Sequence, residues 1–143
     1  MATVFLGLGS NLGNREKALK AATKRLNDKG IRIEKTSSFI ETDPVGGPPQ
    51  EKYLNAVVQG RTELDPHELL SAVKNIENEL GRTPTVRNGP RLIDIDILLY
   101  DDLHMKSPCL TIPHPRMAQR HFVMQPLQEI APHLSKEFQD ADH

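Results

Sequence analysis

Residues 92–99 read Leu92-Ile93-Asp94-Ile95-Asp96-Ile97-Leu98-Leu99, and isoleucines alternate with carboxylates along the middle of this segment. A period of two is typical of a β-strand with one buried face. The three isoleucines then share the core face, and the two carboxylates share the other face, about 6.6 Å apart along the strand. The segment therefore predicts a strand that presents two acids on one surface of a sheet.

The rest of the chain supplies the partners of this strand. Three earlier segments predict strands: Thr3 to Leu8, Ile31 to Ile40, and Tyr53 to Thr62. Two segments predict amphipathic helices: one capped by Asn14 and stopped by Gly30, and one begun by Asp65-Pro66-His67-Glu68 and stopped by Gly81. The order strand, helix, strand, strand, helix, strand predicts an α+β, ferredoxin-like βαββαβ sheet. We expect both helices on one face and the active site on the open face, bordered by loops 43–49 and 82–90.

Length and composition limit the possible classes of function. A chain of 143 residues predicts a single domain over 1–143, with a frayed polar tail at 136–143. The formal net charge of −1 and the lack of any apolar run near 18 residues argue against nucleic-acid and membrane partners. The lone Cys109 allows no internal disulfide, which indicates a reducing, cytoplasmic location.

The paired carboxylates Asp94 and Asp96 admit two interpretations. They could form the solvated face of an amphipathic strand. However, Asp is disfavoured in strands, and like charges on one face repel each other. Mg²⁺ typically takes one or two carboxylates and completes its shell with water and nucleotide phosphates. The pair therefore favours a site for metal and phosphate.

Cations and aromatic side chains surround these acids in the sequence. Guanidinium groups bind phosphate oxygens, although each of these cations could instead lie on a solvated surface, and His114 could be a structural residue of its Pro-rich turn. The cations are Arg82, Arg87, Arg91, His114 and Arg120. Tyr53 and Asn55 fall on the same sheet face as the acids, where a ring and an amide could bind a planar heterocycle, with Phe122 as a second ring. Tyr53 could alternatively be a packing residue.

The glycine-rich start does not match a known nucleotide motif. Gly7-Leu8-Gly9-Ser10-Asn11-Leu12-Gly13 has three residues between its later glycines, where the dinucleotide fingerprint has two. No Gly-Lys-Ser or Gly-Lys-Thr occurs, which excludes a P-loop. We interpret the segment as a tight strand-to-helix turn, with ligand contact as the alternative.

Four motifs in this order resemble the 6-hydroxymethyl-7,8-dihydropterin pyrophosphokinase family over nearly the whole chain. They are Gly9-Ser10-Asn11-Leu12-Gly13, Tyr53-Leu54-Asn55-Ala56, Gly89-Pro90-Arg91-Leu92-Ile93-Asp94-Ile95-Asp96-Ile97-Leu98 and Ile112-Pro113-His114-Pro115-Arg116-Met117. The resemblance implies a folate-pathway enzyme that transfers pyrophosphate from ATP to a pterin alcohol. It also implies a monofunctional enzyme, and we expect a monomer or a weak homo-oligomer.

The resemblance further implies roles for individual residues. Asp94 and Asp96 would hold two Mg²⁺ ions, and Arg82 and Arg91 would act with them in catalysis. The ATP-binding residues would be Glu77, Arg82, Arg91, Ile97, Thr111, His114 and Arg120. The pterin pocket would consist of Thr42, Asp43, Val45, Tyr53, Asn55 and Phe122, with the pterin ring between Tyr53 and Phe122. The chain departs from the common family pattern at Pro84, Asn88, Cys109 and Pro115.

Two other functions are compatible with the same residues. A non-catalytic ferredoxin-like module could bind a metabolite or a partner protein, but it would not need the acid pair. A nucleotidyl transferase could use a strand with two acids, and it would release pyrophosphate rather than AMP.

Overall fold

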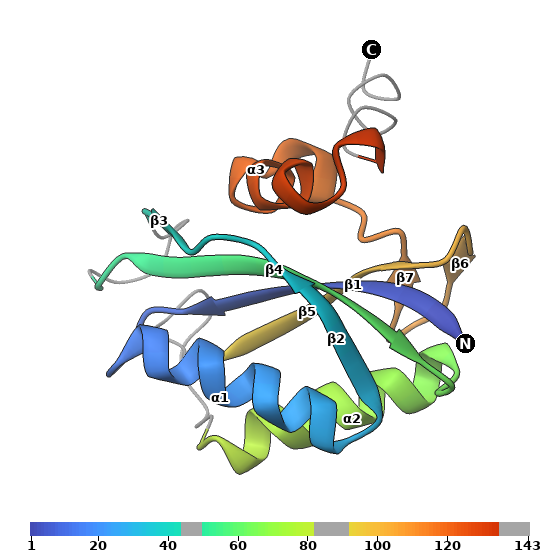
Figure 1. Ribbon diagram of the computed structural model, residues 1–143, viewed down its shortest axis with the longest axis horizontal. Helices are drawn as coiled ribbons and strands as arrows, with labels where there is room; N and C mark the ends of the chain where they lie inside the picture. The colour runs from blue at the N-terminus through green and yellow to red at the C-terminus, as the bar shows by residue number, and fades with distance from the viewer. Residues whose placement is uncertain (44–49, 82–91, 135–143) are drawn as a thin grey trace.

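The computed structural model describes residues 1–43, 50–81 and 92–134 and shows a sheet between two helical layers (Figure 1). The strands of the main sheet are β1 (Ala2–Ser10), β2 (Ile31–Thr36), β3 (Ile40–Thr42), β4 (Tyr53–Thr62) and β5 (Asp94–Tyr100). The helices are α1 (Arg15–Asp28), α2 (Pro66–Glu79) and α3 (His121–Ile130), with a short 3₁₀ turn η1 (Met117–Gln119) before α3.

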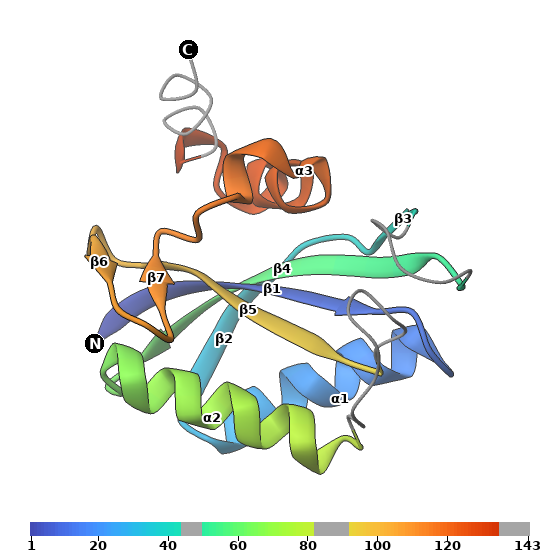
Figure 2. The same cartoon turned by 180° about the vertical axis from the view of Figure 1, so that it is seen from behind.

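The sheet has the predicted ferredoxin-like order. The strands run β2-β4-β1-β5, every neighbouring pair is antiparallel, and β3 extends the sheet beside β4. Helices α1 and α2 cover one face of this sheet, as both views show (Figures 1 and 2). Their apolar sides pack on the sheet through Leu19, Leu26, Leu69 and Ile76, which are fully buried with the sheet residues Leu6 and Val58. The α+β class and the position of these helices are confirmed.

Both helix starts follow from local side-chain chemistry. Asn14 caps α1, since its side-chain oxygen accepts a hydrogen bond from the Lys17 N–H at 3.1 Å. Asp65 and Glu68 form a reciprocal capping box at the start of α2, with bonds of 2.8 and 3.0 Å. These caps orient the two helices that bury one face of the sheet, which leaves the opposite face more accessible to a ligand.

The segment predicted as one strand from Ile31 to Ile40 is two strands. Strand β2 ends at Thr36 and β3 begins at Ile40, although both pair with β4. The break falls at Ser37, whose hydroxyl oxygen accepts the Val57 N–H at 2.9 Å. A serine side chain that takes the place of a backbone acceptor interrupts the regular ladder. The prediction of one continuous strand is therefore wrong.

The face opposite α1 and α2 is only partly open, because α3 lies across it (Figure 1). Val123, Met124 and Leu127 of α3 form a second apolar cluster with Phe5 and Val57 of the sheet. A two-stranded ribbon, β6 (Met105–Lys106) with β7 (Thr111–Ile112), precedes η1 and α3. The sequence predicted only turns in this region.

Helix α3 is also tied to the joint between β2 and β3. The Glu129 carboxylate accepts the Ser38 N–H at 3.0 and 2.9 Å and the Ser38 hydroxyl at 3.1 Å. Apolar packing is non-directional, whereas hydrogen bonds fix a particular orientation. This connection therefore holds α3 in register with the strands below it.

Replacing Glu129 with Ala should reduce the free energy of unfolding by about 1 kcal/mol. The net contribution of an exposed charge-assisted hydrogen bond to stability is of this size. Chemical denaturation of both proteins measures the difference. Gln128→Ala, at the neighbouring exposed position of α3, is the control and should change stability by less than about 0.5 kcal/mol. Equal effects of the two substitutions would contradict a specific connection.

Candidate active site

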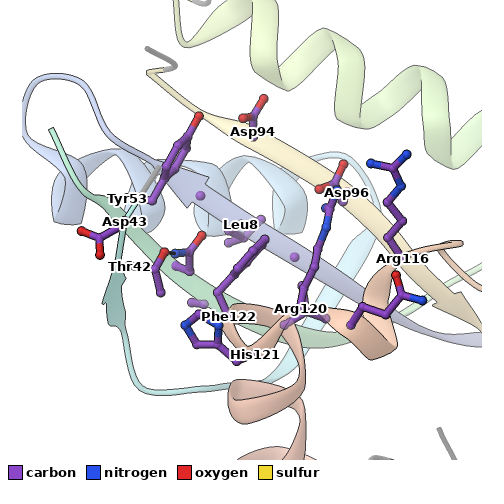
Figure 3. A pocket seen from close by; sticks show the side chains of 16 residues that line it. Leu8, Thr42, Asp43, Tyr53, Asp94, Asp96, Arg116, Arg120, His121 and Phe122 are labelled. Carbon is purple, nitrogen blue, oxygen red and sulfur yellow. Dashed lines mark hydrogen bonds between the residues drawn. The ribbon is translucent and has the colours of Figure 1, made fainter. Parts of the chain in front are cut away.

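A cavity of about 540 Å³ lies on the sheet face that carries α3 (Figure 3). Its floor consists of strand residues and its wall of residues from η1 and the start of α3. The lining residues are Gly7, Leu8, Gly9, Thr42, Asp43, Tyr53, Asn55, Ala56, Asp94, Asp96, Arg116, Gln119, Arg120, His121, Phe122 and Val123. Helix α3 and the sheet thus enclose a space large enough for a small-molecule ligand.

One end of the cavity is aromatic and amide-lined. Tyr53 projects from β4, Thr42 from β3 and Phe122 from α3 (Figure 3), and Asn55 of β4 also lines the cavity. Asn55 is 6% exposed, and its Nδ2 donates a hydrogen bond of 2.7 Å to the Thr42 hydroxyl. This bond fixes the direction of the amide. A flat ligand between Tyr53 and Phe122 would meet stacking surfaces and an oriented polar group.

The other end of the cavity contains charges of both signs. Asp94 and Asp96 project from β5, and Arg116 and Arg120 approach from the opposite wall, with Arg116 beside Asp96 in Figure 3. Among the described residues, no ion pair joins Asp96 to either arginine. An Asp96 carboxylate that shares a cavity with two arginines, without an ion pair between them, is suited to a ligand that bears both a cation and phosphates.

Arg120 also links the two ends of the cavity. Its guanidinium carbon lies 5.5 Å from the centre of the Phe122 ring, a cation–π arrangement. His121 meets the same ring edge-on, with ring centres 6.0 Å apart. The first turn of α3 therefore places one aromatic ring and one arginine at the junction of the two ends.

His114 lies next to the charged end, although it is not among the lining residues. The Leu98 carbonyl accepts its backbone N–H at 3.0 Å, and its Nδ1 accepts the Arg116 N–H at 3.3 Å. Burial lowers the pKa of the His114 imidazole below its usual value, Asp96 acts in the opposite direction, and Arg120 and Arg116 lower the pKa further. The charges of Asp96, Arg116 and Arg120 therefore all act on this imidazole.

The structure gathers most of the sequence-predicted site residues in one cavity. Thr42, Asp43, Tyr53, Asn55, Asp94, Asp96, Arg120 and Phe122 all line it. Arg82, Arg91 and Val45 lie outside the described residues, as do Arg87 and loop residues 44–49 and 82–90.

The remaining predicted ATP contacts, Glu77, Ile97 and Thr111, are not among the described lining residues. Glu77 of α2 is 2% exposed and accepts the Ile95 N–H at 2.9 Å, on the helix-covered side of β5. Ile97 is buried in the core on that side, and Thr111 is half-buried in β7. Their role in ATP binding stays a prediction.

Sequence reasoning missed three polar residues of the cavity: Arg116, Gln119 and His121. Arg116 stands in the quoted segment from Ile112 to Met117, but nothing in its spacing distinguishes it from a surface arginine. Only the fold of η1 and α3 onto the sheet brings it to Asp96. His121 could have been found by its position between Arg120 and Phe122.

The paired acids fit a divalent cation of the magnesium type. In the described part of the chain, no group of three or more His, Cys, Asp or Glu residues could hold a metal ion. A site with only two carboxylates leaves most of the coordination shell to water and to a ligand, which is how Mg²⁺ is commonly bound beside nucleotide phosphates. Asp94 and Asp96 supply the hard oxygen donors that such an ion prefers.

The strand order and the cavity together define a ferredoxin-like α+β domain with a cavity for a small ligand between its sheet and a third helix. Residues 5–132 match the model of the 7,8-dihydro-6-hydroxymethylpterin-pyrophosphokinase (HPPK) family. The chain belongs to this family.

Individual relatives agree with this assignment. The chain is 45% identical over 139 residues to the 2-amino-4-hydroxy-6-hydroxymethyldihydropteridine pyrophosphokinase of Bacillus subtilis, covering 96% of this chain and 83% of that protein. It is 46% identical to the protein of the same name from Porphyromonas gingivalis, covering 96% of both. The fold matches a Plasmodium falciparum HPPK-DHPS structure with pteroate at a TM-score of 0.69 and 17% identity, covering 90% of this chain and 38% of that one.

The charges around His114 predict how its pKa responds to substitution. Arg116→Met should raise the pKa and Asp96→Asn should lower it, because each removes a charge that acts on the imidazole. NMR titration of the His114 ring protons measures both shifts. Since the folded imidazole binds a proton less readily than the unfolded one, the free energy of unfolding should decrease as pH falls below about 6.5. Shifts of the opposite sign would contradict the observed arrangement of charges.

Proposed function

We propose that this chain transfers pyrophosphate from ATP to 6-hydroxymethyl-7,8-dihydropterin, giving the pterin diphosphate and AMP in folate biosynthesis. The observation that carries the proposal is the division of one cavity into an aromatic, amide-lined end and an end with paired acids and cations. A pterin alcohol that accepts a phosphate-borne group needs both ends at once. Membership of the pyrophosphokinase family supports this substrate pair.

The acid end would hold the metal. Asp94 and Asp96 would bind two Mg²⁺ ions together with ATP phosphate oxygens, and bound Mg²⁺ would neutralise phosphate charge during transfer. Arg120 and Arg116 would contact phosphate oxygens from the opposite wall, with His114 adjacent. Arg82 and Arg91, which lie outside the described residues, would also contact phosphate oxygens. Glu77, Ile97 and Thr111 would line the nucleotide side.

The aromatic end would hold the pterin. Its ring would lie between Tyr53 and Phe122, with Asn55 reading the heterocycle edge and Thr42 fixing the amide. Asp43 and Val45 would complete the rim. This placement would orient the hydroxymethyl group toward Asp94 and Asp96. Both acids belong to β5, which lies on the other side of β1 from β4.

The chain's residues then promote transfer mainly by positioning. The pterin hydroxyl oxygen forms a bond to the β-phosphorus, the bond from that phosphorus to the α–β bridging oxygen breaks, and AMP leaves with that oxygen. The hydroxyl proton passes to solvent. Fixed cations aimed at the phosphate oxygens stabilise charge in the transition state, and α3 with its apolar cluster limits the access of water to the cavity.

Other properties remain our proposals. We propose a single pyrophosphokinase domain over 1–143 that acts as a monomer or a weak homo-oligomer in the cytoplasm. None of the described helices has the length and apolar character of a membrane span. The expected tail at 136–143 lies outside the described residues.

The identity of the nucleotide product tests the function. Chromatography of reactions with ATP, Mg²⁺ and the hydroxymethyl-pterin should show AMP formed in step with pterin diphosphate, and none without the pterin. Release of pyrophosphate would indicate a nucleotidyl transferase. No nucleotide turnover under any condition would favour a non-catalytic binding module.

Asp94→Asn and Asp96→Asn should each reduce turnover by at least about 100-fold, because the loss of one carboxylate removes metal-assisted stabilisation worth several kcal/mol. Steady-state rates across a Mg²⁺ titration measure the effect. Asp102→Asn, an exposed acid just beyond β5, is the matched control and should keep normal turnover. Near-normal activity of either site variant at saturating Mg²⁺ would refute the metal assignment.

Asn55→Leu should weaken pterin binding far more than ATP binding, since it leaves buried polar atoms of the pterin unpaired at about 1 to 3 kcal/mol each. Tyr53→Ala should act in the same direction through lost stacking, worth about 0.5 to 1.5 kcal/mol beyond area burial. Separate calorimetric titrations with the pterin and with a non-hydrolysable ATP analogue measure both. If Asn55→Leu weakened both ligands equally, β4 would not be the pterin-binding strand.

A further inference from the structure

Gly9 lies in the floor of the cavity, inside strand β1 rather than in a turn. The sequence predicts a strand-to-helix turn for the glycine-rich segment, but β1 continues to Ser10. Gly9 pairs with Asn55 of β4 on one side and with Asp94 of β5 on the other. Among the described glycines only Gly13, Gly30 and Gly81 have positive φ, so the backbone of Gly9 suits any residue. The backbone conformation therefore does not require a glycine here, and the room available for a side chain has to be considered instead.

Asn55 and Tyr53, which belong to the aromatic end of the cavity, already occupy the space above Gly9. A Cβ atom at Gly9 would lie 3.0 Å from Asn55 Oδ1, and 3.5 and 3.8 Å from the Tyr53 ring carbons Cδ1 and Cε1. A Cβ contact of 3.0 Å is tighter than nine in ten such contacts in proteins. The Asn55 side chain would therefore have to move away from β1 by a few tenths of an ångström.

Asn55 cannot move freely. It is buried, and its Nδ2 is held by the 2.7 Å hydrogen bond to the Thr42 hydroxyl. A retreat of its Oδ1 would rotate or displace the amide and disturb that bond. A methyl group at Gly9 would therefore change the direction in which the Asn55 amide faces the cavity.

Gly7 provides an internal comparison. It lies two residues earlier on β1, lines the same cavity, and pairs with Val57 and Asp96. A Cβ atom there would meet only Leu98 side-chain carbons at 3.6 to 3.8 Å, which is ordinary van der Waals contact. The two glycines share a strand and a face but differ in the space available to a methyl group.

We propose that Gly9 is a positioning residue for pterin recognition: its missing side chain lets Asn55 and Tyr53 take the positions from which they bind the ring. The inference rests on the proposed role of Asn55 and Tyr53, and it adds the strand beneath them to the determinants of specificity. A side chain at Gly9 would narrow the aromatic end first, because the three atoms nearest to its Cβ belong to Asn55 and Tyr53.

The test compares Gly9→Ala with Gly7→Ala by calorimetric titration with 6-hydroxymethylpterin and with a non-hydrolysable ATP analogue. We expect Gly9→Ala to weaken pterin affinity at least tenfold and to change analogue affinity less than twofold. Gly7→Ala, whose Cβ would make only ordinary contacts, should change pterin affinity less than twofold. A general loss of structure would lower both affinities together, so this selective loss separates positioning from a purely structural role. Pterin affinity within twofold of normal in Gly9→Ala, or equal losses for both ligands, would overturn the inference.

A double-mutant cycle tests whether the effect passes through Asn55. In an Asn55→Ala background the 3.0 Å contact is gone, so adding Gly9→Ala should change pterin affinity less than twofold. Additive losses would overturn the inference. If Gly9→Ala alone failed to fold, the double variant should fold, and its failure to do so would count against a role through Asn55.

A readout without ligand separates this inference from the proposed function. The side-chain amide resonances of Asn55 should shift in ligand-free Gly9→Ala and stay in place in Gly7→Ala. Unshifted resonances in Gly9→Ala would overturn the inference even if the enzyme turns over ATP and pterin. Shifted resonances in a protein that binds no pterin would instead refute the proposed function and leave the Gly9 to Asn55 contact intact.

Discussion

The antiparallel register of β1 between β4 and β5 determines where every group on the cavity floor lies. It sets Gly9 between Asn55 and Asp94, and Gly7 between Val57 and Asp96. Side chains alternate along a strand, so a slip of one residue in either pairing would turn the cavity-lining residues into the core and the isoleucines into the cavity. The burial of Ile93, Ile95 and Ile97 against α1 and α2 opposes such a slip. The hydrophobic core thus maintains the geometry of the site on the opposite face.

The second helical layer divides the upper face of the sheet between packing and binding. Val123 and Leu127 of α3 bury apolar surface against Phe5 and Val57, while the first turn of the same helix presents Phe122 to the cavity. Arg120, immediately before this turn, adds the charge. One short helix therefore closes the second core, supplies an aromatic wall and delivers a cation, and the bonds between Glu129 and Ser38 orient its other end.

Local sequence patterns predicted what local physics controls. Alternation placed Asp94 and Asp96 opposite the isoleucines, and the caps at Asn14 and Asp65 were visible as short motifs. The break at Ser37 escaped prediction, because it depends on a hydroxyl that competes with backbone pairing to Val57. The path of α3 over the sheet depends on contacts between residues far apart in sequence, such as those of Ser38 with Glu129, for which no periodicity exists. Arg116 and Gly9 belong to the same class, since only the assembled fold shows what lies next to them.

The charged end of the cavity shows why the fold keeps acids and cations apart. An ion pair between Asp96 and Arg116 or Arg120 would satisfy both groups internally, and a ligand would then have to break it before binding. In the described residues the two arginines instead occupy the wall and the acids the floor, with no such pair formed. Asp96 and the two arginines therefore do not neutralise one another. A polyphosphate that carries divalent cations would offer a partner to Asp96 and to the arginines at once, which neither a bare metal ion nor a bare anion can do, so this separation supports the proposed metal-bound nucleotide.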